Sequence, residues 1–186
     1  MLASDLCYAL DPALLMEQIG LSPDPWQQTL LRSSAKRQIL LCCRQSGKST
    51  TTAVLALHEA LYSPPALVLL LSPSLRQSQE LFRKVIATYK GIDNPVPSTL
   101  ESALRLELAN GSRIISLPGK EETVRGFSGV SLIVVDEASR VANELYFSVR
   151  PMLAVSGGRL VCLSTPFGKR GFFFEEWENG GGWERI

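Results

Sequence analysis

The chain has 186 residues, of which 45% are hydrophobic, and its 19 Lys and Arg nearly balance 18 Asp and Glu, for a net charge of +1. This composition is ordinary for one globular domain and requires no unusual structural class. Because the chain has no overall basic field, any contact with DNA has to come from a local patch or from other parts of a larger assembly.

Targeting and redox signals are absent from the sequence. No charged segment precedes an apolar one at the N-terminus, and no apolar stretch approaches 18 residues, so neither secretion nor a membrane span is indicated. Cys7, Cys42, Cys43 and Cys162 show no paired C-x-x-C spacing, and three of them lie in apolar, strand-like runs. We expect reduced core cysteines of a cytosolic protein, and no zinc site.

The first half of the chain predicts alternating helices and strands. Asp11 and Asp24 are placed to cap two helices, one over 11–19 and one beginning at Pro25. Continuous apolar runs predict buried strands, and longer periodic segments predict the helices between them. The expected order is a strand over 39–43, a helix over 48–62, a strand over 66–71 and a helix over 74–89.

The second half begins with a hairpin signal, Asn110-Gly111, between strands expected at 104–108 and 113–117. A polar loop punctuated by glycine follows over 119–129. We then expect a strand from Leu132, a helix over 144–153, a strand over 159–163 and a helix from Gly171. Apolar strands alternating with helices predict an α/β domain with a mostly parallel sheet covered on both faces. Its ligand belongs at the carboxyl ends of the strands.

Residues 43–50 read Cys-Arg-Gln-Ser-Gly-Lys-Ser-Thr and directly follow an apolar run. A strand that turns at Gly47 into a helix points backbone N–H groups and the helix N-terminus at phosphate. Lys48 would reach the β- and γ-phosphates of ATP, and Ser49 would hold Mg²⁺. Cys42 stands where the common phosphate-loop pattern has its first glycine, and Gly-Lys-Ser alone fits an ordinary strand-to-helix turn equally well.

A second polar pair, Asp136 and Glu137, ends the apolar run 132–135. In a nucleotide-hydrolysing α/β domain this order and polarity assign Asp136 to the metal and Glu137 to the attacking water. The competing interpretation is that the two carboxylates cap a helix. The combination of both motifs favours nucleoside triphosphate hydrolysis.

Four segments together resemble the ATPase domain of the large terminase subunit, the motor that packages DNA into tailed-phage and herpesvirus capsids. Residues 25–27, Pro-Trp-Gln, look like the family's adenine-proximal motif, and 43–50 like its variant phosphate loop. Residues 132–138 are similar to its acidic motif, and 164–168, Ser-Thr-Pro-Phe-Gly, to its coupling motif. The resemblance runs from Trp26 to Gly168.

The resemblance implies a P-loop NTPase fold of the ASCE, RecA/helicase-like type. It implies one ATPase domain over 1–186, with N-terminal helices in 1–36 and the core in 37–186. The ribonuclease-H-like nuclease that follows the ATPase in this family has no counterpart in the chain, which stops at Ile186.

Several nucleotide contacts are also implied by the resemblance. Gln27 would bond the adenine edge, although a surface glutamine has the same appearance, and Trp26 is as readily a core aromatic as an adenine platform. Arg44 would reach the γ-phosphate from the same subunit, or would be a solvated surface arginine. Thr165 would sense the γ-phosphate, or would belong to a plain turn. The remaining loop residues expected at the nucleotide are Gln45, Ser46, Gly47 and Thr50.

A motor of this kind needs an arginine that stabilises the transition state. Arg125, on a glycine-flanked loop, is the favoured candidate to reach a neighbouring subunit, and Arg140 is the alternative. The segment 72–74 with Gln77 is expected either to contact DNA or transmit motion, or to be a solvated helix start. His58, the only histidine, is expected to be structural.

The function implied is ATP hydrolysis that drives double-stranded DNA into a capsid from the cytoplasm of the infected host cell. The implied partners are the portal protein, the small terminase subunit and further copies in a pentameric ring. A helicase is the first alternative, but it would need a second RecA-like domain. A nucleotide-binding module without turnover is the other, and intact Lys48, Ser49, Asp136 and Glu137 argue against it.

Overall fold

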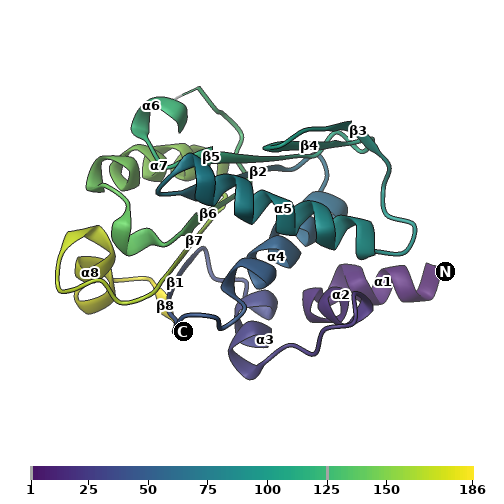
Figure 1. Cartoon of the computed structure of the whole chain (residues 1–186), viewed down its shortest axis with the longest axis horizontal. Coiled ribbons are helices and arrows are strands. Elements are labelled where there is room, and N and C mark those ends of the chain that lie inside the picture. The colour runs from purple at the N-terminus through teal and green to yellow at the C-terminus, as the bar shows by residue number, and fades with distance from the viewer. Residues whose placement is uncertain (1, 125) are drawn as a thin grey trace.

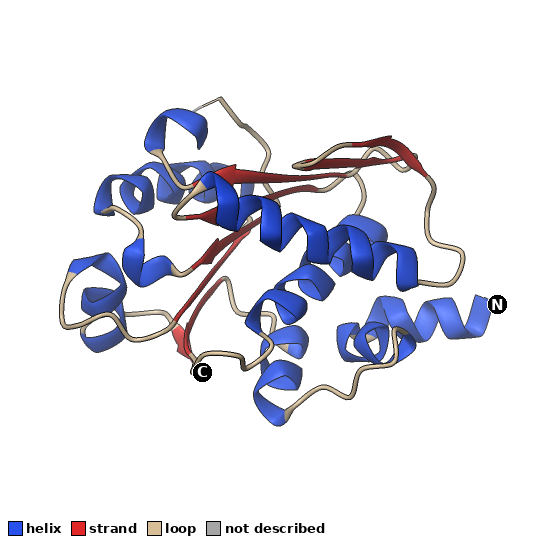
Figure 2. Ribbon diagram, in the orientation of Figure 1, coloured by secondary structure: helices blue, strands red, loops and turns tan. Residues whose placement is uncertain are grey.

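A computed structural model of the chain describes residues 2–124 and 126–186. Its centre is one eight-stranded sheet in the order β3-β4-β5-β2-β6-β7-β1-β8, with helices on both faces (Figures 1 and 2). The strands are β1 (Arg37–Leu41), β2 (Leu67–Ser72), β3 (Ser98–Glu101), β4 (Arg105–Leu108), β5 (Arg113–Pro118), β6 (Leu132–Asp136), β7 (Arg159–Ser164) and β8 (Glu184–Arg185). The predicted α/β class with a mostly parallel sheet is confirmed.

The six strands β5, β2, β6, β7, β1 and β8 run parallel to one another. Strands β3 and β4 add an antiparallel edge beside β5. The central parallel strands are mostly apolar because helices cover them on both sides, and β2 is the clearest case, with all six residues buried. Successive residues then face opposite cores: Leu70 lies in one apolar cluster and Leu69 in the other.

One face of the sheet is covered by α2 (Pro12–Gln18), α3 (Pro25–Arg32), α4 (Lys48–Tyr62) and α5 (Leu75–Gly91). The opposite face carries α6 (Glu121–Val124), η1 (Ala138–Arg140), α7 (Asn143–Ser156) and α8 (Gly171–Glu178). A further helix, α1 (Leu2–Leu10), packs against α2 at the N-terminal end (Figure 1). Among the described helices, none combines the length and the apolar character that crossing a membrane requires.

Several elements were missed or misplaced by the sequence analysis. The structure adds α1, β3, β8 and the one-turn α6 inside the loop expected at 119–129. The strand expected over 39–43 lies at Arg37–Leu41 instead, because Cys42 already belongs to the phosphate loop. These elements are short or exposed, and so they carry weak hydrophobic periodicity. All four residues of β3, for example, are exposed.

The cysteines were also only partly predicted. All four are free, and Cys162 is buried in β7 as expected. Cys7 and Cys43 are exposed, so the expectation of core positions is wrong for them. Cys7 lies on the outer side of α1, and Cys43 lies in the phosphate loop, where the backbone has left the sheet.

Candidate active site

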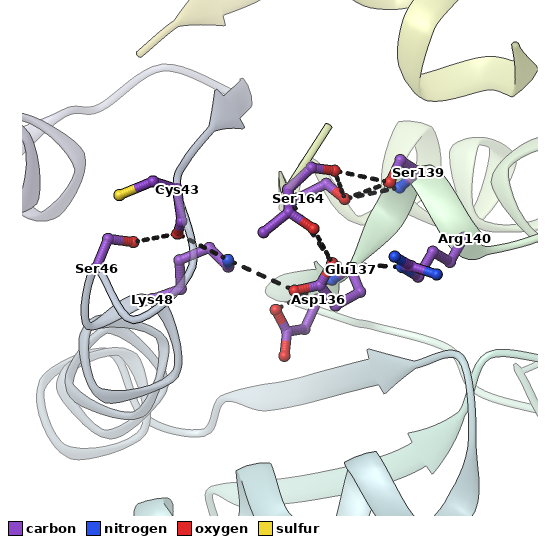
Figure 3. A network of polar contacts seen from close by, with 9 residues as sticks. Cys43, Ser46, Lys48, Asp136, Glu137, Ser139, Arg140 and Ser164 are labelled. Carbon is purple, nitrogen blue, oxygen red and sulfur yellow. Dashed lines mark hydrogen bonds and ion pairs between the residues drawn. The ribbon is translucent and has the colours of Figure 1, made fainter. Parts of the chain in front are cut away.

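The phosphate loop connects β1 to α4 at the carboxyl edge of the sheet. Gly47 is the N-cap of α4 and has φ of +83°, a left-handed conformation that favours glycine. Lys48, the first helical residue, is buried, and its Nζ donates to the carbonyl oxygen of Cys43 at 3.4 Å. The Ser46 hydroxyl donates to the same oxygen at 3.0 Å. The loop therefore curls around the lysine ammonium with the helix N-terminus at its end (Figure 3).

The acidic pair lies at the end of β6, two strands away from β1. Asp136 is 9% exposed, and its Oδ1 accepts from the backbone N–H of Glu137 at 3.0 Å. Burial raises the pKa of Asp136 to about 6, and the neighbouring Glu137 carboxylate adds to the shift. A divalent cation at this carboxylate would favour its charged form.

Glu137 itself adopts a left-handed backbone conformation, with φ of +49° and ψ of +44°. Such a conformation is uncommon for a residue with a side chain and turns the carboxylate away from the strand direction. Although Glu137 is the N-cap of η1, its side chain makes no capping hydrogen bond. Helix capping, the competing interpretation of the acidic pair, therefore does not describe Glu137.

The Glu137 carboxylate is instead the centre of a polar network (Figure 3). Lys48 Nζ lies 3.5 Å from Oε1. The Thr165 hydroxyl donates to Oε2 at 3.0 Å, and Arg140 Nε lies 4.0 Å from the same oxygen. The network thus joins the phosphate loop, the end of β6 and the end of β7.

A serine pair fixes the turn that carries Glu137. The hydroxyls of Ser139 and Ser164 are 2.6 Å apart, and the backbone N–H of Ser139 donates to Ser164 Oγ at 3.2 Å. Ser139 Oγ also donates to the Thr165 carbonyl oxygen at 3.0 Å. These bonds connect η1 to the end of β7, so Glu137 and Thr165 keep a fixed spacing.

An aromatic ring extends the network toward the surface. The guanidinium carbon of Arg140 lies 4.0 Å from the ring centroid of Phe167, and that of Arg170 lies 4.5 Å from it. Both are cation–π distances. The segment 164–168 therefore contacts Glu137 through Thr165 and Arg140 through Phe167.

Lys48, Glu137, Arg140 and Thr165 border a cavity of about 770 Å³. Its wall carries four cationic side chains and one carboxylate, a charge pattern suited to a polyphosphate. The lining residues are Arg44, Gln45, Ser46, Gly47, Lys48, Ser49, Thr50, Gln77, Lys84, Glu137, Arg140 and Thr165. A second cavity, of about 470 Å³, is lined by Ser49, Asp136 and Glu137 together with residues of α5.

The structure brings together most of the predicted site residues, namely Asp136, Glu137, Thr165 and the phosphate loop from Arg44 to Thr50. Trp26 and Gln27 are not among the residues that line either cavity. Trp26 packs partly buried against the core, and Gln27 lies behind the loop. Arg125 falls outside the described residues.

The sequence analysis missed two site residues, Lys84 and Ser139. Lys84 comes from α5 and lines both cavities, with its Nζ 3.5 Å from Thr50 Oγ1. Only the packing of α5 beside α4 brings it there, so no local signal identifies it. Ser139 does follow the acidic motif directly, and that position was the available signal.

Comparison with known proteins identifies the family. A family model described as the N-terminal part of the large terminase subunit, T4likevirus-type, matches residues 39–181. The chain belongs to this family. The large terminase subunit of Thermus phage G20c is 27% identical, over 88% of this chain and 38% of the relative. The chain thus spans less than half the length of this curated relative.

Solved terminase structures share the fold. The large terminase ATPase domain of Thermus phage P74-26 superposes with a TM-score of 0.80 at 22% identity, covering 92% of this chain and 82% of that one. The large terminase of another thermophilic bacteriophage, solved in complex with ADP, gives a TM-score of 0.64 at 10% identity, covering 96% and 44%. At these identities the superpositions establish a shared fold and nothing more.

Proposed function

We propose that this terminase chain hydrolyses ATP and that the hydrolysis drives double-stranded DNA into a preformed capsid. One observation carries the proposal: Lys48 and Glu137 face each other at 3.5 Å across a cavity whose other charged residues are cationic. A triphosphate entering there meets the helix N-terminus and the lysine on one side and a carboxylate for the attacking water on the other.

The residues suit a bound Mg²⁺. Mg²⁺ prefers hard oxygen ligands and usually keeps several waters, with one or two protein ligands beside the substrate phosphates. Ser49 and Asp136 supply a hydroxyl and a carboxylate to the same cavity, which matches that requirement. When bound, the ion would neutralise charge on the phosphate oxygens.

Each protein group then has a chemical role. Lys48 holds the β- and γ-phosphates, after its contact with Glu137 is exchanged for the nucleotide. Glu137 accepts a proton from the attacking water, and Thr165 holds one of its oxygens in place. Arg44, on the cavity wall, contacts the γ-phosphate from the same subunit.

The assembly belongs to the proposal as well. We assign Arg125 to a neighbouring subunit's nucleotide, which requires a ring of copies, a pentamer on the portal protein. We further assign the small terminase subunit as a partner and the cytoplasm of the infected host cell as the place of action. Family membership supports these partners.

DNA contact requires a local basic patch, since the net charge is only +1. The exposed face of α5 offers one away from the cavity, with Arg76, Arg83 and Lys90 against Glu80. Two of these cations have acidic partners, Arg83 with Glu80 and Lys90 with Glu101. We assign this face to the DNA backbone, and binding there should weaken steeply with salt.

Phosphate release from Mg·ATP, measured with and without double-stranded DNA, tests the proposal. We expect the unaltered chain to release phosphate at a rate that differs with and without DNA. Lys48→Ala should abolish this release. Binding of Mg·ATP without any release, at every protein concentration and with DNA present, would instead identify a nucleotide-binding module.

A further inference from the structure

Lys84 brings a positive charge from α5 to the wall of the larger cavity. Its Nζ lies 3.5 Å from the hydroxyl oxygen of Thr50, in the first turn of α4, because α5 packs beside α4 (Figure 1). A neutral hydroxyl at that distance is a weak partner for an ammonium group. An anionic ligand in the cavity can therefore draw Lys84 away from Thr50 with little loss of free energy.

The position of Lys84 relates it to one end of the nucleotide. Four residues line both the larger and the smaller cavity, and they mark the place where the two meet: Ser49, Gln77, Lys84 and Glu137. Ser49 and Glu137 are the residues proposed for Mg²⁺ and for the attacking water, both of which act at or beside the γ-phosphate. Lys84 therefore belongs to the γ-phosphate end of the site.

The charge of Lys84 is not compensated by a carboxylate. Of the four cations on the wall of the larger cavity, Lys48 and Arg140 already face the Glu137 carboxylate, at 3.5 and 4.0 Å. Among the described residues, no carboxylate lies within ion-pair distance of Lys84, whose recorded contact is Thr50. An uncompensated ammonium beside a cavity suited to a polyphosphate favours a further negative charge there.

The other charged residues that α5 contributes to the smaller cavity, Glu80 and Arg83, compensate each other. Arg83 Nη1 donates to Glu80 Oε1 at 2.6 Å, and neither residue lines the larger cavity. The net charge that α5 adds to the site is thus the charge of Lys84.

We propose that Lys84 binds the γ-phosphate, so that α5 distinguishes a nucleoside triphosphate from a diphosphate. The proposal rests on the proposed function and adds to it a phosphate-binding residue that lies outside the phosphate loop. The face of α5 away from the cavity carries the cations assigned to DNA. The same helix then contacts both the nucleotide and the DNA.

The test is equilibrium binding, without DNA, of Mg·ADP and of Mg·AMP-PNP, an ATP analogue with a nitrogen bridge between the β- and γ-phosphates. Lys84→Met keeps the length of the side chain and removes its charge. We expect it to weaken Mg·AMP-PNP by about tenfold, the scale of a charge-assisted hydrogen bond, and to change Mg·ADP by less than about twofold. Lys84→Arg keeps the charge and should stay within about threefold of the unaltered chain for both nucleotides. Lys84→Gln replaces Lys84→Met if that variant does not fold.

Lys36→Met is the matched control. Lys36 is exposed like Lys84 but directly precedes β1, at the edge of the sheet opposite the cavity, so its loss should change neither affinity. The proposal is overturned if Lys84→Met weakens both nucleotides equally, if it weakens neither, or if Lys36→Met or Lys84→Arg reproduces its loss. Failure of the unaltered chain to bind either nucleotide would count against the proposed function instead.

Discussion

Lys48 and Glu137, from opposite sides of the cavity, form an ion pair with 3.5 Å between Nζ and Oε1. The pair is largely buried, and each residue also has a second partner in the protein: the Cys43 carbonyl for Lys48 and the Thr165 hydroxyl for Glu137. A triphosphate has to separate the two residues before either can act on it. Variants of the two residues should therefore have opposite effects on binding.

Glu137→Gln keeps the size of the side chain but removes its charge and its basicity. We expect hydrolysis to fall by at least about a hundredfold, the usual scale for losing a general base. Affinity for Mg·ATP should be retained or increased, because Lys48 no longer has to leave an anionic partner. Single-turnover phosphate release and equilibrium binding measure the two effects, and unchanged turnover would remove Glu137 from the mechanism.

Lys48→Ala should weaken binding itself, because the ammonium offsets phosphate charge that is already present in the ground state. The expected loss is about tenfold or more for Mg·ATP. A nucleotide titration measures it, and equal affinity in the variant and the unaltered chain would contradict the assignment. A thermal melt of the variant provides the control for folding.

Thr165→Val removes the hydroxyl that donates to Glu137 Oε2 and leaves a side chain of similar shape. We expect kcat to fall by about tenfold, as for a lost hydrogen bond to a charged group, with little change in KM. Thr165→Ser keeps the hydroxyl and should restore most of the rate. A purely structural role of Thr165 would predict no difference between the two variants at equal stability.

Arg125, assigned to a neighbouring subunit, allows a mixing test. Arg125→Ala chains and Glu137→Ala chains should each be inactive, and a mixture should regain activity, because some interfaces then join an intact arginine to an intact glutamate. The rate per chain should also rise with protein concentration. If the mixture stays as inactive as its components where the unaltered chain assembles, Arg140 becomes the candidate.

His58 makes stability depend on pH. Burial lowers the pKa of His58 although its ring nitrogen bonds the carbonyls of Tyr8 and Ala9. The folded state thus binds this proton less tightly than the unfolded state does. Its contribution to stability is present above the unfolded pKa, about 6.5, and is lost as the pH falls below that value.

His58→Gln should therefore lose less stability than the unaltered chain between pH 7.5 and pH 5.5. Denaturant unfolding at the two pH values measures the difference. Since Asp11 and Glu59 also titrate in acid, the comparison is made between the two proteins and not against a flat baseline. Parallel pH profiles would exclude His58 as the cause.

The sequence by itself determined the features that depend on neighbours along the chain. The apolar run before Asp136 had to be a buried strand, and the Gly-Lys-Ser turn had to join a strand to a helix, because local burial and backbone freedom decide both. Parallel strands then place both motifs at one edge of the sheet. The α/β class and the grouping of Lys48 with Glu137 could be read in this way.

Tertiary structure decided which side chains from different strands and helices contact one another. The register of β6 on β7 pairs Asp136 with Leu163. It thereby brings Glu137, one residue past this pair, within hydrogen-bond reach of Thr165, two residues past it. The packing of α5 beside α4 places Lys84 on the cavity wall, and the docking of α3 commits Gln27 to the phosphate loop. Such contacts depend on relative placement in three dimensions, which a one-dimensional pattern of side chains does not encode locally.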